Sequence, residues 1–268
     1  MVNVIDLILS PSLPCINMTL KKHIPNLITS LNLAAGFIAI LFAAKNDLIT
    51  SSWLILAAMA FDFLDGFSAR LLKAYSPMGK ELDSLADVVS FGIAPAMIVF
   101  KLIESSGSVA ESISVSSRLF GNPEILKYFA VLMPVFAALR LAKFNIDSSQ
   151  ARSFKGLPTP ANALAVISVV IAAHHSGAAI LESFITSPVI LTVYTVILSL
   201  MMVSRIPLIS LKMSNLRLRG NEGQYFLFSL SIISLLIWRI AAAPLIIPFY
   251  IIASLISPRS DLRSGNQT

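Results

Sequence analysis

Residues 57–70, AAMAFDFLDGFSAR, and residues 81–96, ELDSLADVVSFGIAPA, each join a long apolar segment to a pair of aspartates. Each stretch belongs to an apolar run of about twenty residues, which is enough for an α-helix to cross the ~30 Å hydrocarbon core of a bilayer. Comparable runs recur along the 268 residues. The sequence therefore predicts an all-α, polytopic transmembrane helix bundle with acidic residues in or beside two spans.

The composition supports a membrane protein. Hydrophobic residues make up 56% of the chain, charged residues 13%, and the mean hydropathy is +0.81. Soluble domains carry roughly 25% charged and about 45–50% apolar residues, so a soluble protein with several buried helices is the weaker alternative. No secretory signal peptide is evident, because Pro11 and Pro14 interrupt the first apolar run and no charged segment precedes it.

The net charge of +6 and the pI of about 9.6 would suggest nucleic-acid binding in a soluble protein. In a membrane protein, basic loops facing anionic lipids explain the same charge, so we expect no nucleic-acid partner. The single cysteine, Cys15, excludes an intrachain disulfide and a cysteine metal cluster. The adjacent His174 and His175 do not suggest a zinc site.

Hydropathy predicts eight candidate spans, at approximately 25–44, 48–73, 81–104, 126–144, 160–176, 187–205, 224–238 and 240–256. We divide the chain into a cytoplasmic N-terminal segment, a six-helix core, a C-terminal extension with two further spans and a cytoplasmic tail, at 1–23, 24–205, 206–258 and 259–268. The last two spans are short and separated by little more than Arg239, so a hairpin that does not fully cross is an alternative.

Basic residues predict the orientation. With a cytoplasmic N-terminus, 15 of the 20 lysines and arginines fall on the cytoplasmic side. These are Lys21, Lys22, Arg70, Lys73, Lys80, Arg140, Lys143, Arg152, Lys155, Arg205, Lys212, Arg217, Arg219, Arg259 and Arg263. The opposite side holds Lys45, Lys101, Arg118, Lys127 and Arg239. This asymmetry favours both termini inside, and therefore an even number of spans.

Four of the eight aspartates fall within 26 residues. Asp62 and Asp65 are spaced i, i+3, and Asp83 and Asp87 are spaced i, i+4, so each pair lies on one helix face. The short connection between the two helices makes them antiparallel neighbours, and the two faces can converge. At 4 Å, a pair of like charges costs about 4 kcal/mol even at an effective dielectric of 20.

Protonation, basic partners or divalent metal could neutralise these carboxylates. Arg70 and Lys80 lie nearby but supply only two charges for four. All-oxygen ligands select hard cations such as Mg²⁺, Mn²⁺ or Ca²⁺, and four aspartates could hold two such ions with positions left for substrate oxygens. The alternative is an ordinary set of acidic helix ends, which suits Asp83 near a helix N-terminus but not Asp62 and Asp65 inside a span.

Small residues accompany the aspartates. Gly66, Ala69 and Gly79 would let either a neighbouring helix or a ligand approach the backbone closely, and the sequence does not separate these two roles. Arg70, at the predicted membrane surface, is placed to bind a phosphate.

Together these positions resemble the signature of the CDP-alcohol phosphatidyltransferases, a family that transfers a phosphatidyl group from a CDP-lipid to an alcohol and releases CMP. The matching positions are Asp62, Asp65, Gly66, Ala69, Arg70, Gly79, Asp83 and Asp87. The resemblance covers roughly residues 20–205 and implies a six-helix core.

The resemblance also implies roles for these residues. The four aspartates would bind two divalent ions, Mg²⁺ or Mn²⁺, that bridge the diphosphate of the CDP-lipid, and Asp87 would also act as general base on the acceptor hydroxyl. Gly66 and Ala69 would border the cytidine, Arg70 would hold the phosphates, and Gly79 completes the expected CDP-lipid site. A homodimer is also typical of the family.

The flanking sequence bears on the acceptor. The segments at 24–36, 81–96 and 139–164 look like the phosphatidylserine synthase branch, and Val88 stands where phosphatidylglycerophosphate synthases typically place lysine. The substrates implied are CDP-diacylglycerol and L-serine. Glycerol 3-phosphate or inositol phosphate as the acceptor, and a cation transporter using the same carboxylates, remain the alternatives.

A basic group on the cytoplasmic side could contact the serine carboxylate or a lipid phosphate, although the orientation of the bundle alone would also explain it. Its members are Lys80, Arg140, Lys143, Arg152 and Lys155. The charge asymmetry and the bacterial-looking sequence suggest a bacterial inner membrane, with the active site on the cytoplasmic side.

Overall fold

A computed structural model describes residues 13–110, 123–146, 156–204, 206, 208 and 222–256. Over these ranges the secondary structure is helical and contains no strand. The elements in the first half of the chain are α2 (Leu13–Ala44), α3 (Leu48–Leu72), α4 (Pro77–Asp87), the π-helix η1 (Val88–Ile93), α5 (Ala94–Ala110), α7 (Pro123–Leu126), the 3-10 helix η2 (Lys127–Val131) and α8 (Leu132–Ile146). Those in the second half are α9 (Thr159–Ser176), α10 (Ala179–Ile185), α11 (Pro188–Val203), α12 (Glu222–Trp238), the 3-10 helix η4 (Arg239–Leu245) and α13 (Ile246–Ile256).

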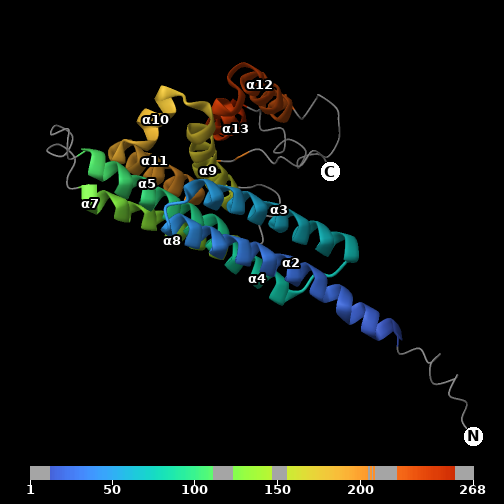
Figure 1. Ribbon diagram of the computed structural model, residues 1–268. Helices are drawn as coiled ribbons and strands as arrows, with labels where there is room; N and C mark the ends of the chain where they lie inside the picture. Colours follow the sequence, from blue (N-terminus) through green and yellow to red (C-terminus); the bar gives the residue numbers. More distant parts are fainter. Residues whose placement is uncertain are drawn as a thin grey trace, which may run out of the picture.

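The helices form two groups. The elements α2, α3, α4–η1–α5 and α7–η2–α8 run side by side, while α9 crosses their direction and α12 and α13 lie beyond it (Figure 1). The N-terminal half of α9 and η1 are in contact, which joins the two groups. The all-α bundle predicted from the sequence is confirmed.

Five stretches of the described chain are long and apolar enough to cross a membrane. They are His23–Ala44, Leu48–Leu72, Pro77–Ser106, Glu124–Ile146 and Gly223–Ser254. A sixth arises if α10 and α11, which meet at 80°, are one broken span. A multi-pass membrane protein is therefore confirmed, with fewer candidate spans than the eight predicted.

Two differences, together with the bend between α10 and α11, account for the lower number. The helix α9 forms where a span was predicted, but it is only 18 residues long and carries Asn162, His174 and His175 near its ends. The two C-terminal spans fall within the single stretch Gly223–Ser254. Within it, Arg239 has a φ of 52° at the start of η4, and α12 and α13 contact each other across this turn. The hairpin alternative describes this arrangement better than two separate spans.

Polar caps define the two helices that carry the aspartates. Asp47 caps α3 by accepting a hydrogen bond from the Thr50 amide, and this bond lowers the pKa of its carboxyl. Because the folded-state pKa is lowered, the stabilising contribution is present above the ordinary value and is lost as the pH falls through the folded value. Ser76 caps α4 by accepting from the Gly79 amide at 3.0 Å, and Pro77 occupies the first helical position.

Glycine allows α2 to pass very close to η1. A Cβ built on Gly36 would lie 2.7 Å from the Ser90 Cα, so the crossing leaves no room for a side chain. The Ser90 hydroxyl donates to the Asn32 carbonyl at 3.0 Å and fixes the same contact. This crossing holds the segment that follows Asp87 against α2.

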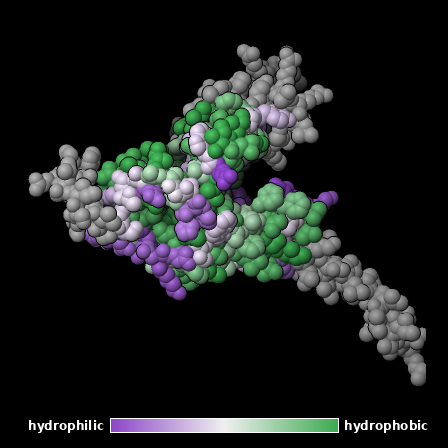
Figure 2. Space-filling model, turned by 45° about the horizontal axis from the view of Figure 1, so that its top comes forward, coloured by the Kyte–Doolittle hydropathy of each residue, from purple (hydrophilic) through white to green (hydrophobic). Residues whose placement is uncertain are grey.

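Large apolar side chains cover much of the outer surface, including Trp53, Phe63, Phe67, Leu236 and Trp238. Figure 2 shows broad hydrophobic areas on one face of the molecule, with hydrophilic residues gathered between them. A soluble monomer rarely exposes apolar patches of this extent, whereas lipid-facing helices require them.

Candidate active site

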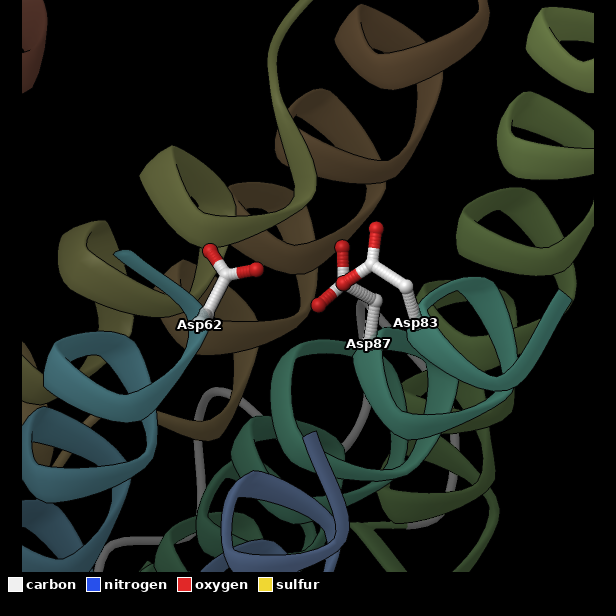
Figure 3. A group of neighbouring side chains, drawn as sticks. All are labelled: Asp62, Asp83 and Asp87. Carbon is white, nitrogen blue, oxygen red and sulfur yellow. The ribbon is translucent and has the colours of Figure 1, made fainter. Parts of the chain in front are cut away.

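Three of the predicted aspartates meet in the structure. Asp62 of α3 points toward Asp83 and Asp87 of α4 (Figure 3), and one carboxylate oxygen from each lies within 4.8 Å of the other two. The i, i+4 spacing places Asp83 and Asp87 on the same face of α4, and the short α3–α4 connection brings Asp62 opposite them. The convergence predicted from the sequence is confirmed for these three residues.

Asp65, the fourth predicted aspartate, lies one turn further along α3. Its side chain is only 6% exposed, it lies beside Thr29 of α2, and its Oδ2 atom has no hydrogen-bond partner. It is within electrostatic range of Asp62, Asp83 and Asp87, although its oxygens are outside the group of three. Its place as a direct metal ligand therefore stays a prediction.

A divalent cation fits this site. The Oδ1 atoms of Asp83 and Asp87 and the Oδ2 atom of Asp65 are buried and accept no hydrogen bond. Buried carboxylate oxygens without partners are costly, and within the described chain none of the four aspartates forms a salt bridge with lysine or arginine. An all-oxygen donor set of this kind suits hard divalent cations.

One of the predicted basic contacts faces the aspartates. Arg140 of α8 is partly buried and lies within electrostatic range of Asp87, and its buried Nε has no hydrogen-bond partner. It is also within electrostatic range of Tyr250 on α13. Arg140 is thus a positively charged group within electrostatic range of Asp87, the aspartate of α4 that is expected to act as base.

The other predicted basic contacts lie differently. The Lys80 ammonium donates to the Asn145 carbonyl at 3.3 Å, and the Asn145 amide donates to Ser84 at 2.9 Å, so Lys80 ties α4 to α8. Lys143, in the last turn of α8, is exposed. Arg152 and Lys155 lie outside the described residues.

The small residues predicted to contact the CDP-lipid divide into two kinds. A Cβ built on Gly66 would meet nothing within 4 Å, so this position opens onto free space beside the aspartates. A Cβ on Gly79 would lie 2.9 Å from the Asn26 Oδ1 atom, so this glycine allows α4 to pack on α2. Ala69 is partly exposed and Arg70 is exposed, both near the end of α3.

Sequence reasoning missed Asn32. This residue of α2 is fully buried with its side chain beside the Asp87 carboxylate, and its Oδ1 atom has no hydrogen-bond partner. A buried amide oxygen without a partner is uncommon, and here it lies in the side chain that borders Asp87. An asparagine in the middle of an apolar span was the available signal, because uncharged polar groups in a span also require partners.

The helix changes its winding directly after Asp87. Residues 88–93 form a π-helix, and the Asn162 side chain of α9 donates to the Phe91 carbonyl in this segment at 3.4 Å. Short π-helical turns inside α-helices often occur at functional sites. Here the wider turn sets the position at which Asp87 enters the site and brings α9 against it.

The comparisons with known proteins agree with this site. Residues 22–201 match the family model described as CDP-alcohol phosphatidyltransferase. This match spans two thirds of the chain and includes all four aspartates. The chain belongs to this family.

Three curated relatives are informative. The chain is 34% identical over 185 residues to the CDP-diacylglycerol–serine O-phosphatidyltransferase of Bacillus subtilis, covering 69% of this chain and 89% of that protein. It is 35% identical over 150 residues to the enzyme of the same name from Helicobacter pylori, covering 55% and 56%. It is 32% identical over 155 residues to the archaetidylserine synthase of Methanothermobacter thermautotrophicus, covering 57% and 60%. The chain thus spans less than two thirds of the last two relatives.

Proposed function

We propose that this chain transfers the phosphatidyl group of CDP-diacylglycerol to the hydroxyl of L-serine, giving phosphatidylserine and CMP. The observation that carries the proposal is the convergence of Asp62, Asp83 and Asp87 in a member of this family. The activities named for the three relatives support serine as the acceptor.

We assign the metal site to Asp62, Asp83 and Asp87, with Asp65 completing it. The four carboxylates together carry four negative charges, which two divalent ions, Mg²⁺ or Mn²⁺, would balance. Bound there, they would shield the diphosphate and the charge that develops on the leaving CMP. The protein contributes fixed carboxylates on two helices that both pack against α2, so the donor phosphates meet ligands that are already in place.

We assign the general base to Asp87. Its carboxylate is buried at the end of α4, beside Asn32 and Arg140, which limits the directions from which an acceptor can approach. In the reaction the serine oxygen forms a bond to the phosphorus that carries the diacylglycerol, and the bond from that phosphorus to the CMP oxygen breaks. The hydroxyl proton passes to Asp87.

We propose that Arg140 binds the carboxylate of serine. In serine only two carbon atoms separate the hydroxyl oxygen from the carboxylate carbon. A cation next to the base is therefore in reach of the carboxylate when the hydroxyl faces Asp87. Gly66 opens onto the space in which the cytidine would lie, and Arg70 at the end of α3 would contact the donor phosphates.

A phosphorylated acceptor is the second candidate. Glycerol 3-phosphate or inositol phosphate carries about two negative charges, and more than one basic side chain would be expected around it. Arg140 is within electrostatic range of Asp87, and one guanidinium group suffices for the single carboxylate of serine. A cation transporter is less well supported, because all four aspartates lie in the half of α3–α5 next to the α3–α4 connection.

We further propose that both termini and the site face the cytoplasm of a bacterial inner membrane, as the distribution of lysine and arginine suggests. Impermeant labelling of single cysteines at Lys45 and Tyr75, in a Cys15→Ser background, tests the orientation. The reagent added from outside is expected to label position 45 and not position 75. Labelling of position 75 from outside would reverse the proposed orientation. The homodimer typical of the family is tested by cross-linking in native membranes.

The reaction is tested with purified protein, CDP-diacylglycerol and labelled serine, with Mg²⁺, Mn²⁺ or a chelator. We expect CMP release and labelled phosphatidylserine with metal and neither with chelator. Release of CMP with glycerol 3-phosphate but not with serine would refute only the choice of serine as the acceptor. The absence of metal-dependent CMP release with every acceptor would refute the reaction.

A further inference from the structure

The π-helix η1 lies in the interior of one continuous helical stretch, Pro77–Ser106, which runs from α4 into α5. The Ala94 amide donates to the Val89 carbonyl, five residues back, so this turn contains one residue more than a turn of α-helix. At 3.6 residues per turn, one extra residue rotates the part of the helix before it by about 100° relative to the part after it. The wide turn therefore decides which way the aspartates of α4 face.

The part of the helix that follows is fixed by its neighbours. Phe91 and Ile98 are fully buried, and a Cβ built on Gly92 would lie 3.1 Å from the Ala137 Cβ atom of α8. In α4, by contrast, only two of the 11 residues are buried. A change in the winding of η1 would therefore turn α4, together with its aspartates, and leave α5 in place.

A proline stands directly after the wide turn. Pro95 is buried and has no N–H group, and in an α-helix its ring would collide with the carbonyl four residues earlier, which is that of Phe91. An α-helical turn at this point would also leave the Phe91 carbonyl without its usual donor. The donor comes instead from another helix, because the Asn162 side chain of α9 donates to the Phe91 carbonyl at 3.4 Å.

Asn162 is a costly residue for a position that only needs filling. It is fully buried, and its Oδ1 atom has no hydrogen-bond partner. A leucine of about the same size would occupy the space without an unpaired polar atom. The amide group is therefore explained by its bond to η1 and not by packing.

We propose that Asn162 is a positioning residue that acts through the Phe91 carbonyl. Together with Pro95 it keeps the turn after Asp87 in its wide form, which directs the carboxylates of α4 toward Asp62 (Figure 3). The α9 helix, which carries no carboxylate, would thus set the direction from which the base meets the acceptor. This inference rests on the proposed function, because it assumes that Asp87 is the base.

The first test is the Asn162→Leu variant, which removes the donor and nearly keeps the volume. A small displacement of a catalytic group costs much of the rate, so kcat should fall about 10–10²-fold. The KM for CDP-diacylglycerol should stay within about threefold, because Asp62, Gly66 and Arg70 belong to α3 and do not move. An unchanged kcat in this variant would overturn the proposal.

Ser168→Ala is the matched control on the same helix. The buried Ser168 hydroxyl donates to the Ala165 carbonyl of α9 itself, at 2.9 Å, and makes no bond to η1. Its kcat should equal that of the parent, and Asn162→Leu should lower the unfolding midpoint no further than this control does. A fall in kcat that the control shares would show a general effect on α9 and would overturn the proposal.

Pro95→Ala tests the same turn from the other side. Alanine restores the N–H group at this position and is the better helix former, so the turn can close as an α-helix. We expect kcat to fall as in Asn162→Leu, while the unfolding midpoint stays equal or rises. A purely structural role predicts that activity follows stability, so full activity in Pro95→Ala would overturn the proposal.

The double variant then tests whether the two residues act on one turn. In the Pro95→Ala background, Asn162→Leu should change kcat less than about twofold, because the turn has already closed. Additive effects of the two substitutions would overturn the shared route through Phe91. If the parent shows no metal-dependent CMP release with serine, the proposed function fails; if the parent is active and both single variants match it, only this inference fails.

Discussion

Asp87 occupies the last position of α4, where the chain passes into a π-helix and where Asn32 and Arg140 approach from two other helices. This setting suits a base that must face a bound hydroxyl, since the surrounding groups leave the carboxylate few other orientations. Two variants test the roles of individual positions at this site.

Asp87→Asn keeps the size of the side chain and one ligand oxygen but removes the basic carboxylate. We expect turnover to fall by about 10²–10⁴-fold, while the protein still inserts and elutes as the parent does. The measurement is CMP release together with size-exclusion chromatography. Asp47→Asn, at the start of α3, is the control and should retain activity, because asparagine also caps helices. Near-normal turnover in Asp87→Asn would remove this residue from the base role.

Gly66→Ala distinguishes a ligand position from a packing position. The added methyl group meets no protein atom within 4 Å, and alanine favours a helix by up to about 1 kcal/mol over glycine, so the fold should not weaken. If the nucleotide lies against Gly66, the KM for CDP-diacylglycerol rises several-fold. Competition by CMP and thermal unfolding are the measurements.

Gly36→Ala gives the contrasting result at a tightly packed glycine. Its methyl group would meet the Ser90 backbone, so the free energy of unfolding should fall by about 1–3 kcal/mol. An unchanged KM for CDP-diacylglycerol in Gly66→Ala, with the Gly36→Ala protein destabilised as expected, would show that the donor does not reach Gly66.

The aspartate cluster could be predicted from residue spacing, because helical periodicity puts Asp83 and Asp87 on one face and a short connection brings Asp62 opposite. The surroundings of Asp87 could not be obtained in this way. Asn32 and Arg140 lie far from it in the sequence, and only the packing of α2 and α8 brings them near it. Spacing within one helix holds no information about such contacts.

At the scale of single elements, α4 depends on its first residues. It has only 11 residues, it has low intrinsic hydrophobicity, and it carries two of the three clustered aspartates. A short helix of this kind gains much of its stability from its cap and from packing.

Ser76→Ala removes the side-chain acceptor of the Gly79 amide. We expect the free energy of unfolding to fall by about 1 kcal/mol and metal affinity to weaken, because the first turn of α4 frays. Ser76→Asn is the control and should keep the free energy of unfolding and the metal affinity of the parent. The measurements are thermal unfolding in detergent micelles and metal titration; equal stability of Ser76→Ala and the parent would contradict the capping role.

The element boundaries show where hydropathy is informative and where it is not. The first four predicted spans correspond to helices, because long apolar runs and their polar connections are local signals. The π-helix after Asp87 and the 80° bend between α10 and α11 are not local in this sense. The first coincides with the close crossing of Gly36 with Ser90, and the size of the second is not set by Ser187 and Pro188, the local break signal at the start of α11.

For the molecule as a whole, the unpaired carboxylates predict that metal stabilises the fold. A ligand that binds only the folded state at 100 times its Kd adds about 2.7 kcal/mol to the free energy of unfolding. Addition of Mg²⁺ or Mn²⁺ to chelator-treated protein should therefore raise the unfolding midpoint. This readout does not depend on substrate or turnover.

Asp62→Asn provides the control for the metal effect, since it removes a charge from the group of three without adding volume. Its unfolding midpoint should depend much less on metal than that of the parent. The same metal-induced shift in the variant and the parent would show that the ion binds elsewhere.

The origin of the site residues in different helices has a consequence for how this protein can change over time. The clustered carboxylates come from α3 and α4, whereas Arg140, the proposed contact of the acceptor carboxylate, comes from α8. With the roles proposed here, substitutions in α8 should change the acceptor without loss of donor chemistry. Differences in acceptor choice among descendants of this chain should therefore accumulate in α8, and a library for directed evolution toward other alcohols would begin there.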